Sequence, residues 1–302
     1  MGGAARARGV SSQRMYHVMM LPGMLFVLIF CYIPMFGVVM AFQDYVPAKG
    51  ILGSKFVGLK NFSYMFSLPD VSRIFVNTLV IAIGKIILGT LMAIVFAILL
   101  NEIRCKLFKK TVQTIVYLPH FLSWVVLAAV VVNMVNLDGP LNQLLELVGL
   151  GKINFLGSNV WFRPMIIATD VWKEFGYNSI VYLAAITAID PGLHEAAAMD
   201  GATWWKRVWH VTLPGMLPII LLMAAMNLTS ILSAGFDQIY NLYSPMVYQT
   251  GDVLDTYVYR MGLISRQYSF STAVGLLRSV VGMILMLTAN GLAGRFTDRK
   301  IF

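Results

Sequence analysis

The sequence predicts an all-α membrane protein with six transmembrane helices. Composition is the first reason: 58% of the 302 residues are hydrophobic, only 12% are charged, and the mean hydropathy is +0.74. A soluble domain carries about 25% charged residues. The second reason is that apolar stretches recur along the whole chain, and about 20 apolar residues suffice to cross a hydrocarbon core. Because backbone groups in lipid must bond within their own segment, we expect these stretches to be helices.

The apolar stretches can be followed in order along the chain. The six expected spans cover about 16–42, 73–100, 112–136, 160–188, 213–235 and 271–293. The first follows Arg6, Arg8 and Arg14, as a secretory signal would, but it is too long and lacks a small-residue cleavage site, so we expect it to be retained. Three segments between spans face outward, and the first and last are long enough to pack on something or to form part of a gate. They cover about 43–72, 137–159 and 236–270.

Basic residues concentrate on one side of the membrane. The N-terminal arm, the 101–111 turn, the loop after the fourth span and the C-terminal tail carry about half of the 23 Lys and Arg. Cytoplasmic loops are enriched in these residues, so both termini are expected to be cytoplasmic. The expected organisation is an arm over 1–15, a membrane domain over 16–294 and a tail over 295–302. The net charge of +9 follows from this topology, which argues against nucleic-acid binding.

Several kinds of site are not expected in this chain. Cys31 lies in the first span and Cys105 in a turn, so they cannot form a disulfide, and neither has a metal-ligand neighbour. His194 and Glu195 begin like a zinc-protease motif, but position 198 is Ala198. No G-x-x-x-x-G-K-[ST] phosphate loop occurs, so any ATPase must be another chain. We therefore expect no metal ligand and no catalytic residue here.

The loop between the fourth and fifth spans carries the most informative motif. It reads EAAAMDGATWWKRVWHVTLPGMLP from Glu195 onward. Asp190 and Pro191 are suited to begin a helix. The alanines after Glu195 favour a helix with little side-chain bulk, and Gly201 permits a sharp bend. Pro214 marks the return into the bilayer. We expect two short helices that form a rigid protrusion over residues 190–212.

This loop resembles the EAA coupling loop in the membrane subunits of binding-protein-dependent ABC importers, the type I importer permeases. The matching residues are Glu195, Ala196, Ala197, Asp200, Gly201, Ala202, Leu213 and Pro214. The resemblance implies that the loop sits in a cleft of an ATP-hydrolysing subunit, with Glu195 orienting the loop and the alanines making the close contact. The alternative is an amphipathic helix at the membrane surface, anchored by Trp204, Trp205 and Trp209.

The resemblance also implies an assembly in the bacterial cytoplasmic membrane. The implied partners are a second homologous permease, two ATP-binding subunits, an extracytoplasmic solute-binding protein and membrane lipid. ATP and Mg²⁺ would be bound by the partner ATPase, and this chain would hold no cofactor. It would supply half of a translocation path that alternates between inward-open and outward-open forms.

The solute is suggested by a second resemblance. The stretches 77–103 and 236–260 look like oligosaccharide permeases of the maltose-type branch, particularly the lipoprotein-associated and polysaccharide-uptake relatives. This implies import of an oligosaccharide or a polysaccharide fragment. An importer permease for a non-sugar solute is one alternative. An ion-coupled secondary transporter is another, and it predicts matched carboxylates in two inverted halves. Asp170 and Glu174 have no such match.

Ionisable and polar residues within the spans are candidates for the solute pathway. Ionisable groups in hydrocarbon are costly unless they face a cavity or a partner. An interruption expected at Gly176 would place aromatic and amide groups near the middle of the membrane, where a sugar ring and its hydroxyls could bind. Asn227 is included from the resemblance, and Lys85 and Arg278 would favour a uronate-bearing sugar. Packing between helices is an open alternative for each residue. The expected pathway residues are Lys85, Trp172, Glu174, Tyr177, Asn178, Asn227, Asp237 and Arg278.

Overall fold

The computed structural model describes the backbone of residues 3–296 and the side chains of residues 15–288. Almost all of it is helical. The strands in this part of the chain are the two-residue β1 (Gln43–Asp44) and β2 (Lys55–Phe56), which pair antiparallel. The predicted all-α class is thus confirmed. Residues 1–2 of the predicted arm and residues 297–302 of the predicted tail lie outside the described residues.

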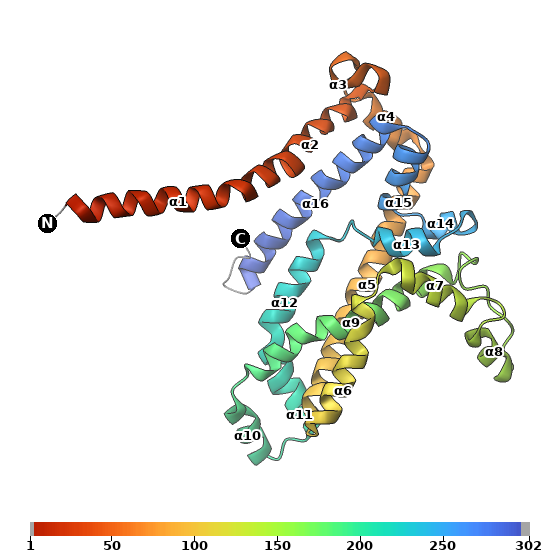
Figure 1. Cartoon of the computed structure of the whole chain (residues 1–302). Helices are drawn as coiled ribbons and strands as arrows, with labels where there is room; N and C mark the ends of the chain where they lie inside the picture. Colours follow the sequence, from red (N-terminus) through yellow and green to blue (C-terminus); the bar gives the residue numbers. More distant parts are fainter. Residues whose placement is uncertain (1–2, 297–302) are drawn as a thin grey trace.

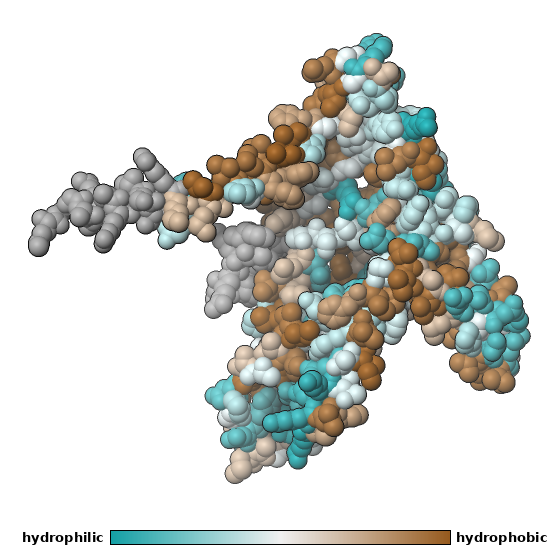
Figure 2. Space-filling model, in the orientation of Figure 1, coloured by the Kyte–Doolittle hydropathy of each residue, from teal (hydrophilic) through white to brown (hydrophobic). Residues whose placement is uncertain are grey.

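The first span stands apart from the rest of the molecule. It begins with α1 (Gly3–Val27) and projects away from the other helices (Figure 1). It continues through η1 (Leu28–Tyr32), α2 (Ile33–Met35) and η2 (Phe36–Phe42), the last of which packs on the final helix. Only 6% of its most apolar window is buried. Its hydrophobic side chains are open to lipid or to another chain (Figure 2).

Two long helices form the centre of the molecule. They are α5 (Pro69–Glu102) and α9 (Phe162–Thr187), which pack along each other (Figure 1). The approach is close because small residues of α5 face α9: Ala93 and Ala97 lie in one buried cluster with Tyr182. This pair provides two walls of the cavity described below.

Five helical segments in the described part of the chain are long and apolar enough to cross a membrane. They are Met15–Phe42, Pro69–Glu102, Trp124–Leu147, Trp204–Thr229 and Tyr268–Thr288. The predicted fourth span corresponds to α9, which has 26 residues but carries four charged side chains. These are Arg163, Asp170, Lys173 and Glu174. The total of six transmembrane helices therefore stays a prediction: it requires α9 in addition to the five segments above.

The third expected span is broken, whereas the sequence predicted one helix over 112–136. The structure has α6 (Lys106–Tyr117), a 3-10 turn, η4 (Leu118–Phe121), and then α7 (Trp124–Val135). Pro119 explains the break because it has no amide hydrogen to continue the helical bonding. Ser123 then begins α7 by accepting a hydrogen bond from a backbone amide of its first turn.

The fifth span also ends earlier than predicted. The helix α12 (Leu213–Thr229) stops before residue 235, and the chain turns through Gly235, whose φ is +94°, into α13 (Phe236–Leu242). Within this turn the amide and the hydroxyl of Ser230 donate to the carbonyl of Asn227, and the amide of Ser233 donates to the carbonyl of Ser230. The last helix, α16 (Tyr268–Phe296), packs on α12.

The outward segments fold into short helices. The first holds η3 (Pro47–Lys49), α3 (Gly50–Gly53) and α4 (Lys60–Ser67). The second holds α8 (Pro140–Leu147). The third holds η6 (Pro245–Val247), α14 (Tyr248–Gly251), α15 (Leu254–Tyr259) and η7 (Arg260–Ile264). Within the third segment Asp252 pairs with Arg260, and burial raises the pKa of Asp252 although the arginine opposes that rise.

Candidate functional site

The predicted protrusion is present between α9 and α12. It consists of α10 (Pro191–Met199), α11 (Trp204–Arg207) and the π-helical turn η5 (Val208–Thr212), at the end of the molecule opposite α3 (Figure 1). The carboxylate of Asp190 accepts a hydrogen bond of 2.9 Å from the amide of Gly192, which confirms the expected helix start. Hydrophilic side chains gather at this end of the surface (Figure 2).

A bend separates α10 from α11. Gly201 has a φ of +73°, a left-handed conformation that residues with a Cβ rarely adopt. The bend is held by backbone bonds: the amide of Ala202 donates to the carbonyl of Ala197 at 2.9 Å, and the amide of Asp200 donates to that of Ala196 at 3.0 Å. This arrangement is a standard helix ending with glycine just past the last turn. It fixes the angle between the two short helices.

The two halves of the protrusion differ in exposure. In α10, the side chain of Glu195 is exposed and makes no hydrogen bond or ion pair to the part of the chain that the structure describes, while Leu193 and Met199 are 55% and 89% exposed. In the second half, Val208 is buried and Trp204 packs on the cluster shared by α5 and α9. The second half therefore anchors the protrusion, and the first half projects from it.

The remaining motif residues follow the same division. Asp200 and Gly201 are exposed and Ala202 is half-buried, at the tip of the bend. Leu213 is half-buried against the same cluster that holds Trp204, and Pro214 is exposed in the first turn of α12.

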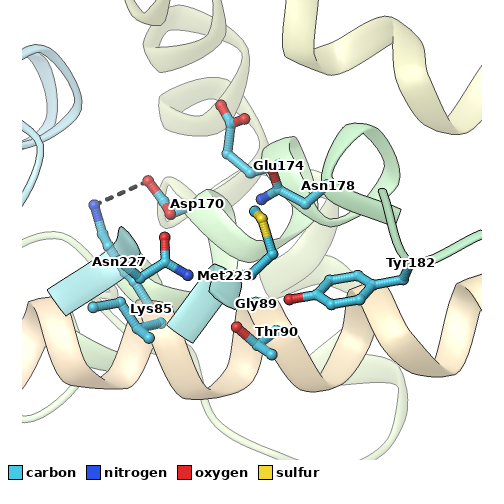
Figure 3. Close-up of a pocket in the computed structure, with 10 residues that line it drawn as sticks. Lys85, Gly89, Thr90, Asp170, Glu174, Asn178, Tyr182, Met223 and Asn227 are labelled. Atoms are coloured by element: carbon cyan, nitrogen blue, oxygen red, sulfur yellow. Dashed lines mark ion pairs between the residues drawn. The ribbon is translucent and has the colours of Figure 1, made fainter. Parts of the chain in front are cut away.

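A polar cavity lies between α5, α9 and α12. It has a volume of about 150 Å³. The side chains around it include charged, amide, hydroxyl and apolar groups (Figure 3). The lining residues are Lys85, Ile86, Gly89, Thr90, Asp170, Glu174, Asn178, Tyr182, Met223 and Asn227. The mixture suits a solute that carries both hydroxyl groups and a charge.

An ion pair occupies one end of this cavity. The ammonium of Lys85 lies 3.0 Å from Oδ1 of Asp170 (Figure 3). The same ammonium donates to the carbonyl of Ala234 at 2.7 Å and to the side-chain amide oxygen of Gln238. Pairing and hydrogen bonding make these charges tolerable in a membrane interior.

The second carboxylate of the cavity, that of Glu174, is held by residues that do not line the cavity. Glu174 accepts from Lys173 at 2.9 Å and lies 2.7 Å from Nδ1 of His120. Lys173 also donates to the backbone carbonyl of His120 at 2.8 Å, within the break between α6 and α7. The ring of Tyr177 stacks on His120, with the centroids 3.8 Å apart and the planes parallel. This cluster connects α9 to the broken span.

The structure brings together four of the eight predicted pathway residues, Lys85, Glu174, Asn178 and Asn227. Trp172 is 45% exposed and Asp237 is exposed, and neither lines the cavity. Tyr177 packs on His120. Arg278 lies in a separate groove lined by α16, the turn after α12 and the end of the first span, where it pairs with Asp255 and donates to Ser233.

The predicted interruption of α9 at Gly176 is wrong, because the helix is continuous through this point. The glycine serves packing: a Cβ at this position would lie 2.5 Å from the carbonyl oxygen of Val116 on α6. The sequence does not show whether a glycine within an apolar stretch interrupts the helix or allows a second helix to pack closely against it.

Three polar lining residues were not among the predicted pathway residues: Thr90, Asp170 and Tyr182. The sequence contains a pattern that points to two of them, Asp170 and Tyr182. Asp170, Glu174, Asn178 and Tyr182 follow one another at intervals of four, and this spacing places them along one face of a helix. Trp172, two residues from Asp170, falls on the opposite face.

Known proteins provide an independent comparison. Residues 85–299 match the family described as "Binding-protein-dependent transport system inner membrane component". The chain is 44% identical over 291 residues, 96% of this chain and 91% of the relative, to the polygalacturonan/rhamnogalacturonan transport system permease protein YteP of Bacillus subtilis (strain 168). It is 39% identical over 287 residues, 95% of this chain and 90% of the relative, to Protein LplB of the same organism.

The fold has a close counterpart among solved structures. A chain in the crystal structure of a bacterial alginate ABC transporter, in complex with alginate pentasaccharide-bound periplasmic protein, is 38% identical. The alignment covers 97% of this chain and 99% of that one, with a TM-score of 0.89. This likeness confirms the predicted type I importer permease fold.

These findings decide between the classes of protein considered from the sequence. They exclude the secondary transporter, and the apolar helices together with the family place the chain in the inner membrane as a multi-pass protein. No group of three or more metal-ligating side chains occurs among the described residues. The chain belongs to the family of binding-protein-dependent transport system inner membrane components and is a permease subunit of an ABC importer, a transport component and not an enzyme.

Proposed function

We propose that this permease carries an oligosaccharide derived from an acidic polysaccharide. The observation that carries the proposal is the likeness to a permease named for polygalacturonan and rhamnogalacturonan and to a chain in the structure of a transporter that imports the acidic polysaccharide alginate. The cavity agrees with it: Asn178, Asn227, Thr90 and Tyr182 offer hydrogen-bonding groups for hydroxyls, and Lys85 offers a positive charge.

The translocation path needs a second permease. The cavity of about 150 Å³ is smaller than the roughly 300–1,000 Å³ of ordinary small-molecule sites, so we infer that a facing chain would complete it around an oligosaccharide. The exposed first span offers hydrophobic surface for contact with a homologous chain. An extracytoplasmic solute-binding protein would deliver the solute to the outward segments, as the periplasmic protein in the alginate complex suggests.

The protrusion over 190–212 would couple transport to two ATP-binding subunits, which would bind the ATP and Mg²⁺. Its first half presents the exposed side chain of Glu195 and the exposed apolar side chains of Leu193 and Met199, as a docking element does. Its second half is anchored on α5 and α9, which line the cavity. A displacement of α10 would therefore be transmitted to the cavity walls. Both termini would lie on this cytoplasmic side.

The test uses the complete complex in lipid vesicles. The permease is co-expressed with its neighbouring permease, ATPase and binding-protein genes, and ATPase activity and uptake are measured with loaded binding protein. Trigalacturonate, alginate trisaccharide and maltotriose are compared. We expect acidic trisaccharides to stimulate ATP hydrolysis and to enter the vesicles. Stimulation by maltotriose alone would contradict the acidic solute, and stimulation by none of the saccharides would favour a non-sugar solute.

A further inference from the structure

We propose that Lys85 binds the carboxylate of the solute and that Asp170 is its resident counter-ion, which the solute carboxylate replaces during passage. The proposal rests on the proposed function, since it requires an acidic saccharide in the cavity. It assigns three roles that the family likeness does not give: an anion-binding residue, an exchangeable partner and a positioning residue, Gln238.

The Lys85 ammonium is fully occupied in this structure. An ammonium group has three N–H donors. Three acceptors surround it: Asp170 at 3.0 Å, the carbonyl of Ala234 at 2.7 Å, and the side-chain oxygen of Gln238. A solute group can therefore bind the ammonium only if one of these three acceptors leaves.

Burial decides which acceptor can leave. Ala234 is 1% exposed and Gln238 is 0% exposed, and neither lines the cavity. The side chain of Asp170 is 22% exposed and does line the cavity, on the same wall as Glu174 and Asn178 (Figure 3). Of the three acceptors, only Asp170 lies where a solute can take its place.

Gln238 holds Lys85 in position independently of Asp170. Its side-chain nitrogen donates to the carbonyl of Ile166 at 2.7 Å and to the hydroxyl of Thr169 at 2.8 Å, both on α9. With the nitrogen held there, the oxygen of the amide must face Lys85. The left-handed turn at Gly235 brings this acceptor close, and a Cβ there would lie 3.0 Å from the Lys85 nitrogen.

The exchange distinguishes an acidic solute from a neutral one. A solute carboxylate that replaces Asp170 restores a charge-assisted bond to the ammonium, whereas a hydroxyl leaves the buried cation without a counter-charge. Asp170 remains in the cavity wall beside Glu174, and these two carboxylates repel the bound anion. Return of Asp170 to Lys85 then releases the solute, so binding stays reversible, as transport requires.

The test compares trigalacturonate with its methyl ester, which has the same sugar units and no carboxylate. KM and kcat for ATP-driven uptake are measured in vesicles that hold the complete complex. For Lys85→Met we expect the KM for trigalacturonate to rise about tenfold, equivalent to about 1.4 kcal/mol, with the ester changed less than about twofold. For Asp170→Asn we expect KM and kcat for trigalacturonate both to fall several-fold, because the anion binds more tightly and leaves more slowly.

Two further variants complete the test. One avoids the misfolding that an unpaired buried charge could cause, and the other tests whether Gln238 positions Lys85. Lys85→Met combined with Asp170→Asn leaves no unpaired buried charge, and we expect it to transport acid and ester with equal KM. Gln238→Leu should raise the KM for the acid and leave the ester unchanged. The matched control is Asp255→Asn, which breaks the ion pair with Arg278 outside the cavity and should not alter the acid-to-ester ratio.

The outcomes separate this proposal from the one on which it rests. Wild-type uptake of the acid, together with an unchanged acid-to-ester ratio in Lys85→Met and Asp170→Asn, overturns the exchange mechanism and leaves the proposed function standing. Wild-type complex that imports neither saccharide contradicts the proposed function, and this mechanism with it.

Discussion

Charged side chains inside this permease are held by specific partners, and the Lys173 cluster shows what such a group contributes. Lys173 is 7% exposed, and it neutralises Glu174 while bonding a backbone carbonyl that the break after Tyr117 leaves without its helical partner. The residue thus stabilises an irregular backbone at membrane depth, where an unsatisfied carbonyl is costly. Its role differs from that of a surface lysine with the same contact distance.

That difference can be measured with a matched pair of substitutions. Lys152 also lies 2.9 Å from a carboxylate, that of Asp138, but both side chains are well exposed. We expect Lys173→Met to lower the stability of the purified complex by about 1–3 kcal/mol, because Glu174 and the carbonyl of His120 lose a charged donor. The apparent melting temperature should fall by several degrees, and Lys152→Met should leave it unchanged. Equal shifts for both would show that burial does not matter here.

The conformation of Gly201 leads to a second prediction. Its φ of +73° would strain any residue with a Cβ, at a cost of about 1–3 kcal/mol, so Gly201→Val should alter the angle between α10 and α11. We expect uptake and solute-stimulated ATP hydrolysis to fall at least several-fold while the complex still assembles, as judged by co-purification. Gly192→Ala is the control, because Gly192 has no positive φ and its added Cβ would meet only the Asp190 side chain, at 3.2 Å. Full uptake by Gly201→Val would exclude a fixed bend as the coupling element.

At the level of whole elements, the sequence predicts where apolar stretches lie better than where they break. Hydropathy identifies the stretches because lipid requires about 20 apolar residues whatever the neighbours are. It does not show that the third span breaks after Tyr117, because a proline inside a membrane helix is often accommodated when neighbouring groups bond the freed backbone. Here Lys173, which is 53 residues away from His120, bonds a carbonyl within the broken stretch. Such a partner is visible only in the folded chain.

Close packing of α6 on α9 gives a third prediction. Gly176→Ala would place a Cβ 2.5 Å from the Val116 carbonyl, so the helices must separate. We expect a marked loss of folded protein in the membrane, measured as the fraction that remains monodisperse after extraction in mild detergent. Gly282→Ala, in α16, is the control because nothing in the described chain lies within 4 Å of the added Cβ. A normal yield of Gly176→Ala would mean that α6 moves freely against α9.

At the scale of the whole molecule, the sequence predicts nearly all of the protrusion, whereas only four of the eight predicted pathway residues line the cavity. The protrusion is local, and its helix start, alanine run and bend are determined by neighbouring residues from Asp190 to Gly201. The cavity joins α5, α9 and α12, and its lining depends on how each helix is rotated about its axis. Hydropathy does not determine that rotation for a helix surrounded by lipid and protein. Hydropathy alone therefore does not show whether Trp172 or Asp170 faces the cavity, and the four-residue spacing of the polar residues on α9 is the signal that separates them.

The two cysteines permit a direct test of the orientation that the basic residues predict. Both are free and exposed on the protein surface, but Cys31 lies within the first apolar span, and Cys105 lies in the basic turn between α5 and α6. If that turn is cytoplasmic, a membrane-impermeant maleimide should label Cys105 in inside-out vesicles and not in intact cells or spheroplasts. Cys31 should resist labelling in both, since lipid excludes the reagent.

A single added thiol tests the opposite side of the membrane. Leu52 is fully exposed in α3, at the end of the molecule opposite α10, so Leu52→Cys in a Cys105→Ser background should be labelled only from outside. The Cys105→Ser protein without the added cysteine measures the background from Cys31. Labelling of Cys105 from outside would reverse the topology, and it would place the protrusion where no ATP-hydrolysing subunit can reach it. The coupling role of residues 190–212 would then have to be abandoned, because the turn before α6 and α10 lie at the same end of the molecule (Figure 1).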